Sequence, residues 1–326
     1  MSPPGESLAD YLSQAGYDCW AIDLRGTRSS IPPYGRKREA ESLDDYVFED
    51  IPAAIETIQR ETGYSQVHWV GHSLGGMLLY AYDAAFGSKQ LACGVTLGSP
   101  AGFAGAHMAR PGVLLYVLRY ARPALSVLVR ALAPLFNRFQ PNVRGLPMNW
   151  ENLKPGVNTR VFFNVFDPNS YWIARELTGW AISRSWRMRN GTLDVDAGMK
   201  KLGTPLFAIY GSRDPLTPRG VVQDFFDALP GDDKKMLVLG KDEGADMDYS
   251  HIDLAFSKNA EKEVYEPIAD WLRLHPIGGG KAKDGDEGKV EFKRRARLKH
   301  ADPTSEAIIK GKVKPRASLA PRRRKK

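Results

Sequence analysis

The sequence is poor in cysteine and histidine. Its two cysteines, Cys19 and Cys93, each lie in a short apolar run, where a thiol usually behaves as a small buried side chain. Two cysteines in 326 residues cannot build a disulfide framework, so a reducing compartment is favoured. The cysteines and the six histidines lack the spacing of metal ligands, and G-x-G-x-x-G does not occur. We therefore expect neither a metal nor a nucleotide cofactor.

Long apolar runs are also missing. The nearest candidate for a membrane span, residues 113–136, is interrupted by Arg119, Arg122, Pro123 and Arg130. The opening "MSPPGESLAD" has neither the basic start nor the apolar stretch of a signal peptide. These absences predict a chain without a transmembrane segment and favour a cytoplasmic location.

The excess of positive over negative charge is confined to the end of the chain. The formal net charge is +8, yet residues 1–280 carry 29 basic and 32 acidic side chains, against 17 and 6 in residues 281–326. We expect residues 277–326 to form a disordered basic tail. Such a tail could contact nucleic acid or an anionic membrane, or serve only as a solubilising extension. Its single aromatic residue, Phe292, does not indicate base stacking.

The first hundred residues alternate between helical and strand-like patterns. This alternation is typical of an α/β fold, with a mostly parallel sheet and helices on both faces. The expected helices are residues 7–16, capped by Ser7, residues 49–63, capped by Asp50, and residues 73–86; the expected buried strands are residues 17–23, 66–70 and 91–99.

The middle of the chain interrupts this alternation. Residues 101–200 are rich in Arg, Pro and amphipathic helical segments, and contain no convincing strand. Strand and helix patterns resume at residues 204–211 and continue to about residue 274. We therefore predict a core of residues 1–100 and 201–276 with a helical cap, residues 101–200, inserted before the strand at 204–211. Four tryptophans of the cap are each expected to pack in its core rather than bind substrate: Trp150, Trp172, Trp180 and Trp186.

The stretch "VHWVGHSLGG" contains a candidate nucleophile. Gly71, Ser73 and Gly75 match G-x-S-x-G, in which a strand turns directly into a helix and exposes a strained serine at the helix N-terminus. Small residues two positions before and after the serine are expected to allow this close approach. The helix dipole would favour negative charge developing there. The alternative is an ordinary strand-to-helix turn, but its place between an apolar strand and an apolar helix favours the nucleophile.

A nucleophilic serine needs a base and an acid that orients the base. Five of the six histidines lie within strands, the turn, the insertion, a helix end or the tail, which leaves His251 in "DYSHIDL". Asp214 in "GSRDPLTP" directly follows the strand at 204–211 and is the candidate acid, although aspartate is also common in turns. Asp253 is expected to neighbour a helix cap. Rival acids lie on the histidine's own loop: Asp242, Asp246 and Asp248.

With these residues in order, the chain resembles the α/β-hydrolase superfamily and, within it, bacterial relatives of the acid lipases. The resemblance is carried by "SLADYLSQAGYDCWAIDLRG", "VHWVGHSLGGMLLYAY", "GSRDPLTP" and "DYSHIDLAF", within residues 6–276. It implies a Ser73–His251–Asp214 triad, a helical cap over the site and hydrolysis of carboxylic esters. The apolar faces of the cap suit a lipophilic acyl group.

The chain departs from this family at the oxyanion hole. Leu74 supplies one backbone N–H, but the second comes from a loop after an earlier strand, and only "MSPPGE" precedes the first helix. We expect a core that is incomplete at its N-terminus and a strand with a bare edge. The sequence is then a fragment or has a misassigned start, or the chain is a non-catalytic paralogue, or a partner or the cap supplies the donor.

Two functional alternatives remain open at this stage. An acyltransferase would use the same triad, with an alcohol in place of water. A pseudo-hydrolase would act as a scaffold tethered by its basic tail. Ser73 argues against epoxide hydrolases and dehalogenases, which use Asp, and against polyester synthases, which use Cys. The substrate and the oligomeric state cannot be derived from the sequence.

Overall fold

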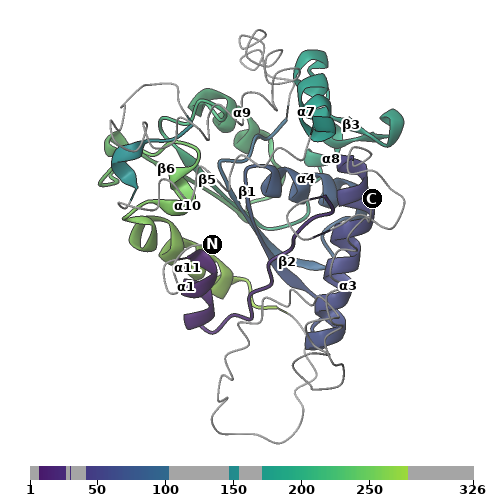
Figure 1. Cartoon of the computed structure of the whole chain (residues 1–326), viewed down its shortest axis with the longest axis horizontal. Helices are drawn as coiled ribbons and strands as arrows, with labels where there is room; N and C mark the ends of the chain where they lie inside the picture. The colour runs from purple at the N-terminus through teal and green to yellow at the C-terminus, as the bar shows by residue number, and fades with distance from the viewer. Residues whose placement is uncertain (1–6, 27–29, 31–41, 103–146, 154–170, 278–326) are drawn as a thin grey trace, which may run out of the picture. The chain divides into compact units, whose positions relative to one another are not determined.

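A parallel sheet of four strands lies at the centre of the described part of the chain (Figure 1). The computed structural model describes residues 7–26, 30, 42–102, 147–153 and 171–277. The strands follow the order β1 (Val67–His72), β2 (Leu91–Leu97), β5 (Leu206–Gly211) and β6 (Lys234–Leu239). Because all three pairings are parallel, the carboxyl ends of the strands meet at one edge. The strands predicted at 66–70, 91–99 and 204–211 are confirmed.

Helices cover both faces of the sheet, as the alternating pattern predicts. One face carries α3 (Ile51–Thr62), α4 (Leu74–Phe86), α8 (Val195–Met199) and α9 (Arg219–Ala228). The other face carries α1 (Leu8–Gln14), the π-helix η7 (Glu261–Tyr265) and α11 (Glu266–Leu274). Figure 1 shows α1 and α11 together on the left and α3 on the right.

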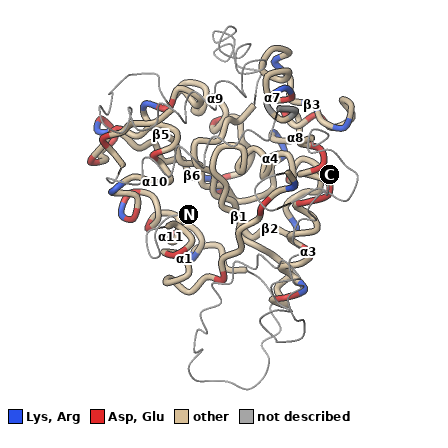
Figure 2. The backbone as a smooth tube through the Cα atoms, viewed as in Figure 1, with Lys and Arg blue, Asp and Glu red and all other residues tan. Residues whose placement is uncertain are grey.

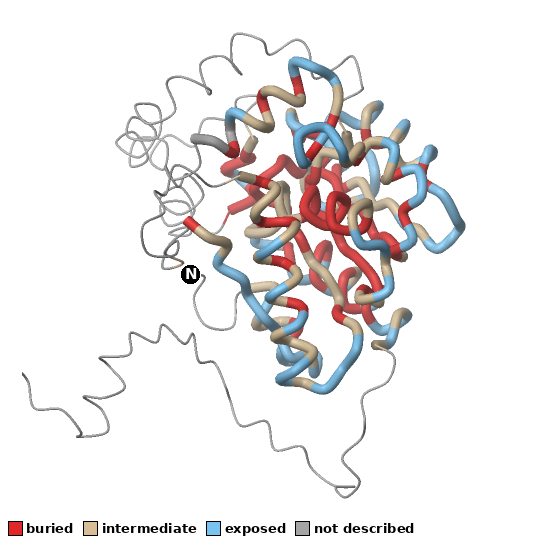
Figure 3. Tube along the Cα trace, turned by 90° about the vertical axis from the view of Figure 1, so that its right-hand side faces the viewer, coloured by how far each residue is buried: buried red, intermediate tan, exposed pale blue. Residues whose placement is uncertain are grey.

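The core follows from the apolar composition of the strands. All six residues of β5 are buried, with Phe207 and Ile209 packing toward α11 and Ala208 and Tyr210 toward α9. A parallel strand covered on both faces needs apolar residues throughout, which explains its continuous rather than alternating pattern. Figure 3 shows buried segments inside and exposed segments outside, and Figure 2 shows charged residues mostly on the surrounding helices and loops.

A buried carboxylate joins α4 to the start of β5. Asp83, 5% exposed, accepts hydrogen bonds from the backbone N–H of Gly203 (3.3 Å) and Thr204 (3.1 Å) and from the Thr204 hydroxyl. A carboxylate buried in a core is stable there only when its oxygens are satisfied in this way. Asp83 therefore fixes the point at which the chain re-enters the sheet.

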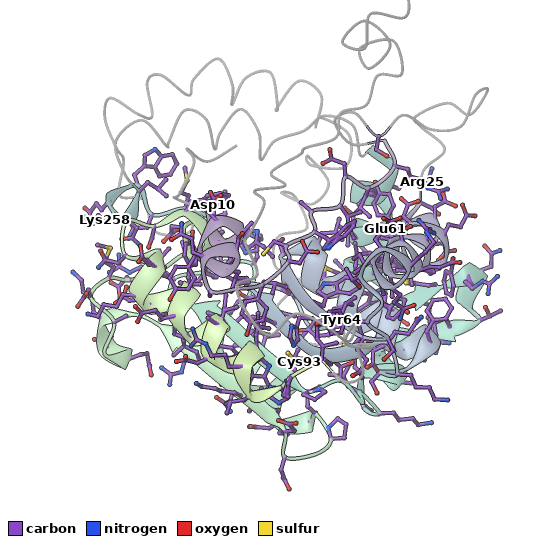
Figure 4. All side chains as sticks on the ribbon, turned by 90° about the horizontal axis from the view of Figure 1, so that it is seen from below. Asp10, Arg25, Glu61, Tyr64, Cys93 and Lys258 are labelled. Atoms are coloured by element: carbon purple, nitrogen blue, oxygen red, sulfur yellow. The ribbon has the colours of Figure 1, made fainter. Side chains whose placement is uncertain are left out.

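The helix predicted at 49–63 begins earlier than expected. Asp50 does not cap it, because the chain is already helical through α2 (Leu43–Asp45) and the π-helix η2 (Tyr46–Asp50). Ser42 is the N-cap instead, in a reciprocal capping box with Asp45. The Asp50 carboxylate binds Arg25 (labelled in Figure 4), accepting from its backbone N–H at 2.9 Å and its Nε at 2.8 Å.

The buried strand predicted at residues 17–23 is wrong. Residues 17–24 form no strand and are largely exposed, with Trp20 45% and Ile22 47% accessible. Both cysteines were expected to be buried. Cys19 is exposed, whereas Cys93 on β2 is buried (labelled in Figure 4). An apolar run becomes a strand only beside another strand that pairs with its backbone. Within the described ranges, residues 17–23 pair with no strand, and β1, at the edge of the sheet, pairs with β2 alone.

The predicted cap is only partly described. Its described elements are the 3₁₀ turn η4 (Trp150–Asn152), α7 (Tyr171–Ser183), β3 (Arg187–Met188), the 3₁₀ turn η5 (Arg189–Gly191), β4 (Leu193–Asp194) and α8. The expectation of no strand is corrected by the short antiparallel pair β3–β4. Trp150 and Trp186 are buried as expected. The predicted basic tail at 277–326 lies outside the described residues apart from residue 277. No helix in the described ranges is long and apolar enough to cross a membrane.

Candidate active site

The chain turns directly from β1 into α4 at Ser73. This serine has φ 54° and ψ −114°, a conformation that residues other than glycine rarely adopt. Its N–H donates to the carbonyl of Leu97 at the end of β2, at 2.8 Å. The strained turn predicted for G-x-S-x-G is therefore present, and it places the Ser73 hydroxyl at the carboxyl edge of the sheet.

Glycine makes this turn possible, but not at both expected positions. A Cβ on Gly71 would lie 2.4 Å from the backbone of Gly75, so Gly71 must be glycine. A Cβ on Gly75 would meet nothing within 4 Å, which corrects the expectation that this position also needs a small residue. The second tight contact is at Gly76, where a Cβ would lie 2.1 Å from the Ser99 Oγ.

The residue after Ser73 can supply an oxyanion donor. Leu74 is the first residue of α4, and the N–H groups of a helix's first turn have no intrahelical acceptor. They carry the positive end of the helix dipole, which stabilises an anion at that position. Leu74 is the donor that the sequence predicts; a second donor was not identified from the sequence.

The imidazole of His251 lies between Ser73 and Asp214. His251 Nε2 is 2.8 Å from Ser73 Oγ, and Nδ1 is 2.8 Å from Asp214 Oδ2. A carboxylate only accepts hydrogen bonds, so Nδ1 carries the proton of the neutral ring and Nε2 accepts from the serine hydroxyl. The three residues follow the ends of different strands: His251 is 37 positions from Asp214 and 178 positions from Ser73 in the sequence.

Asp214 is held in place by its own loop. The carboxylate is 4% exposed and accepts the backbone N–H of Leu216 at 2.8 Å and the Thr217 hydroxyl at 2.7 Å, in addition to His251. Two of the rival acids have other partners: Asp248 pairs with Arg213, and Asp246 contacts Lys262 and Asn259. Of the candidate acids, Asp214 is the one that contacts the imidazole.

The loop that carries His251 is tied to several elements. Arg213 N–H donates to the Tyr249 carbonyl at 2.8 Å, and Ile252 N–H donates to the Pro147 carbonyl at 2.8 Å. The carboxylate of Asp253 accepts the backbone N–H of Ser250 at 2.9 Å. The same carboxylate binds residues 147–153, the segment from the predicted cap, through Asn149 N–H at 3.0 Å and Asn152 Nδ2 at 2.7 Å. Burial raises the pKa of Asp253.

Sequence reasoning missed three residues that surround the imidazole. Gly98, at φ +55°, faces the histidine–aspartate pair, and a Cβ there would lie 3.0 Å from His251 Nδ1 and 3.1 Å from Asp214 Oδ2. Thr217 hydrogen-bonds the acid, and His72 hydrogen-bonds the His251 backbone at 2.8 Å. Only Gly98 carries a sequence signal, a glycine at the carboxyl end of a parallel strand, where the predicted site residues also lie.

An apolar cluster lies beside Leu74. Its side chains come from α2, α4, α7, β3 and the residue before β3. None of them is charged: Leu43, Leu74, Met77, Leu78, Ala81, Trp180, Trp186 and Met188. The space between these side chains is too small for a water molecule, so they form a packed apolar wall next to the candidate oxyanion donor.

Comparisons with known proteins identify the fold family of the chain. The family model for the α/β hydrolase fold matches residues 2–244, a range that includes Ser73 and Asp214 and ends before His251. Gastric triacylglycerol lipase of Mus musculus is 35% identical over 94 residues, 26% of this chain and 24% of the lipase. A probable lipase of Schizosaccharomyces pombe is 20% identical over 310 residues, 84% of this chain and 67% of the lipase.

Solved structures show the same fold. A monoacylglycerol lipase of Paleococcus ferrophilus aligns with a TM-score of 0.50 at 19% identity, covering 82% of this chain and 88% of that chain. At this identity the likeness concerns the fold alone. The chain spans about a fifth to a quarter of the length of the first curated relatives it matches.

Proposed function

The chain belongs to the α/β hydrolase fold family, and from this premise we propose that it hydrolyses a carboxylic ester through an acyl-enzyme formed on Ser73. The observation that carries the proposal is the unbroken chain of hydrogen bonds from Ser73 through His251 to Asp214, with both contacts at 2.8 Å. A serine, a base and a buried orienting acid in this geometry form an activated nucleophile.

The proposed reaction has two steps. Ser73 Oγ attacks the ester carbonyl carbon while His251 Nε2 takes the hydroxyl proton, and the Leu74 N–H stabilises the resulting oxyanion. The C–O bond to the alcohol then breaks, and His251 returns the proton to the leaving alkoxide. In the second step a water molecule attacks the carbonyl carbon of the acyl-enzyme while His251 Nε2 takes a proton from it. The bond between Ser73 Oγ and the acyl group then breaks, His251 returns the proton to Ser73, and the carboxylic acid leaves. Asp214 holds the imidazole throughout.

The apolar side chains around Leu74 support an acyl group of lipophilic character. Leu74 contributes both the proposed oxyanion donor and part of this apolar cluster, so an acyl group on Ser73 would lie beside hydrocarbon side chains. The lipases among the relatives act on lipophilic esters, as their names say, which agrees with this assignment. We expect faster hydrolysis of p-nitrophenyl esters with acyl chains of several carbons than of the acetate.

A fluorophosphonate probe tests the proposal directly. The full chain should be labelled covalently, and Ser73→Ala should abolish labelling and lower kcat by about 10³-fold or more. Ser99→Ala is the matched control, because Ser99 is buried near the turn and its hydroxyl donates to the Leu97 carbonyl, not to a residue of the triad. A folded chain that resists the probe would support the non-catalytic scaffold instead.

A further inference from the structure

The residue before the nucleophile lies against the proposed general base. His72 ends β1, and its ring centroid is 4.9 Å from that of His251, with the planes inclined by 45°. Its Nε2 is 2.8 Å from the backbone carbonyl of His251. His72 therefore connects the strand that carries the nucleophile to the loop that carries the base, across 179 positions of sequence.

The direction of this hydrogen bond follows from its acceptor. A carbonyl oxygen only accepts, so Nε2 of His72 carries the proton and donates it. In the neutral ring Nδ1 is then unprotonated, and the tautomer is fixed. Burial, and next the neighbouring His251, lower the pKa of His72 to about 4. His72 thus remains an uncharged donor while the adjacent imidazole cycles through its protonated form.

The peptide group that follows His251 is held on both sides. The Ile252 N–H donates to the Pro147 carbonyl at 2.8 Å, and the His251 carbonyl accepts from His72 Nε2 at 2.8 Å. Of these two partners, His72 is the one on the strand that carries the nucleophile. Rotation of that peptide would turn the Cα–Cβ bond of His251 and move Nε2 away from Ser73.

We infer that His72 is a positioning residue, which sets the distance between His251 Nε2 and Ser73 Oγ by anchoring the His251 backbone to the strand that carries the nucleophile. The inference rests on the proposed function, since it assigns a role within the same site. His72 hydrogen-bonds the backbone carbonyl of His251, whereas His251 Nε2 is hydrogen-bonded to Ser73 Oγ, so we assign His72 to the geometry of the base and not to proton transfer.

Two substitutions separate the donor from the shape of the ring. His72→Phe keeps a ring of similar size and removes the donor, whereas His72→Gln loses the ring and retains an N–H group near the position of Nε2. We expect His72→Phe to lower kcat on p-nitrophenyl butyrate by about 10²-fold with KM within about 3-fold of the parent value. His72→Gln should retain kcat within about 5-fold, because the anchor is kept.

Proton NMR supplies a readout that does not depend on turnover. The proton between His251 Nδ1 and Asp214 should give a low-field resonance, whose assignment is checked by its loss in Asp214→Asn. The resonance should persist in His72→Gln and disappear or broaden in His72→Phe. Circular dichroism confirms that each variant is folded; if His72→Phe is not, His72→Asn replaces it, because its shorter amide cannot reach the carbonyl.

The inference is overturned if the donor-free variant keeps both its kcat and its low-field resonance, or if the Phe and Gln variants lose kcat equally. Failure of the proposed function looks different. The parent chain would then show no turnover and no Ser73-dependent labelling, and the comparison of resonances between the Phe and Gln variants would still decide whether His72 anchors His251.

Discussion

The two halves of the proposed site are built in opposite ways. The nucleophile half, residues 71–76, is held by its own backbone, through the strained φ of Ser73 and the glycine contact between Gly71 and Gly75. The base half, residues 248–253, has no regular structure before α10 (Asp253–Phe256) and is held by polar contacts to distant elements. A strained local turn needs small residues at set positions, whereas an irregular loop needs partners supplied by the rest of the fold.

The largest effect is expected where the nucleophile half is most crowded. Gly71→Ala places a Cβ 2.4 Å from the backbone of Gly75, and backbone cannot give way as a flexible side chain can. We expect the free energy of unfolding to fall by at least about 3 kcal/mol and fluorophosphonate labelling to slow at 15 °C. Urea titration measures the first and gel fluorescence the second. An alanine variant of parent stability would show that the turn is not locally constrained.

The base half should be sensitive to the loss of its buried carboxylate. Asp253→Ala leaves the N–H groups of Asn149 and Ser250 without their acceptor and releases Asn152. Buried donors without a partner each cost about 1–3 kcal/mol, so we expect a loss of about 2–3 kcal/mol after relaxation, together with slower turnover. Asp242→Ala is the control on the preceding surface turn, η6 (Lys241–Glu243). Equal effects in both would contradict a specific role for the carboxylate.

A change of pH tests the link between the halves. The unfolded chain protonates His72 near pH 6.5, but the folded chain, in which its pKa is about 4, does not. Between these values the unfolded state binds more protons, so stability falls as the pH decreases from 6.5 to 4, by about 2–3 kcal/mol from this residue. The same urea series on His72→Gln should show a shallower decline over this window. Parallel curves would mean that His72 titrates normally in the fold.

The smallest effect is expected at Gly75. Its φ is not positive, and an added Cβ would meet nothing within 4 Å, although the sequence motif marks this position as glycine. Alanine has a higher helix propensity, so Gly75→Ala should leave stability unchanged or raise it by up to about 1 kcal/mol, with labelling retained. Thermal unfolding measures this shift. A loss as large as that of Gly71→Ala would remove the distinction between the two glycines.

The parallel core could be predicted from the sequence because its signal is local. Apolar runs bounded by glycine, and helices with clear caps such as Ser7, identify themselves within about ten residues. The run at 17–23 has the same composition but is not in the sheet, because composition does not say whether a neighbouring strand is available. Asp50 is not a cap because the helical segments that begin after Ser42 already run through it, and its carboxylate binds Arg25, 25 residues away.

The sequence by itself determined the alternation of most core elements and the candidates for the proposed triad, with Asp214 preferred among several aspartates, because each candidate follows a recognisable strand in a parallel sheet whose ends converge. Only the tertiary structure decided which glycines are indispensable, which aspartate contacts the imidazole, and that His72 and Asp253 hold the loop of His251. These depend on distances of a few ångströms between residues that are far apart in the chain. Local propensity carries no information about such distances, because they are set when the core packs.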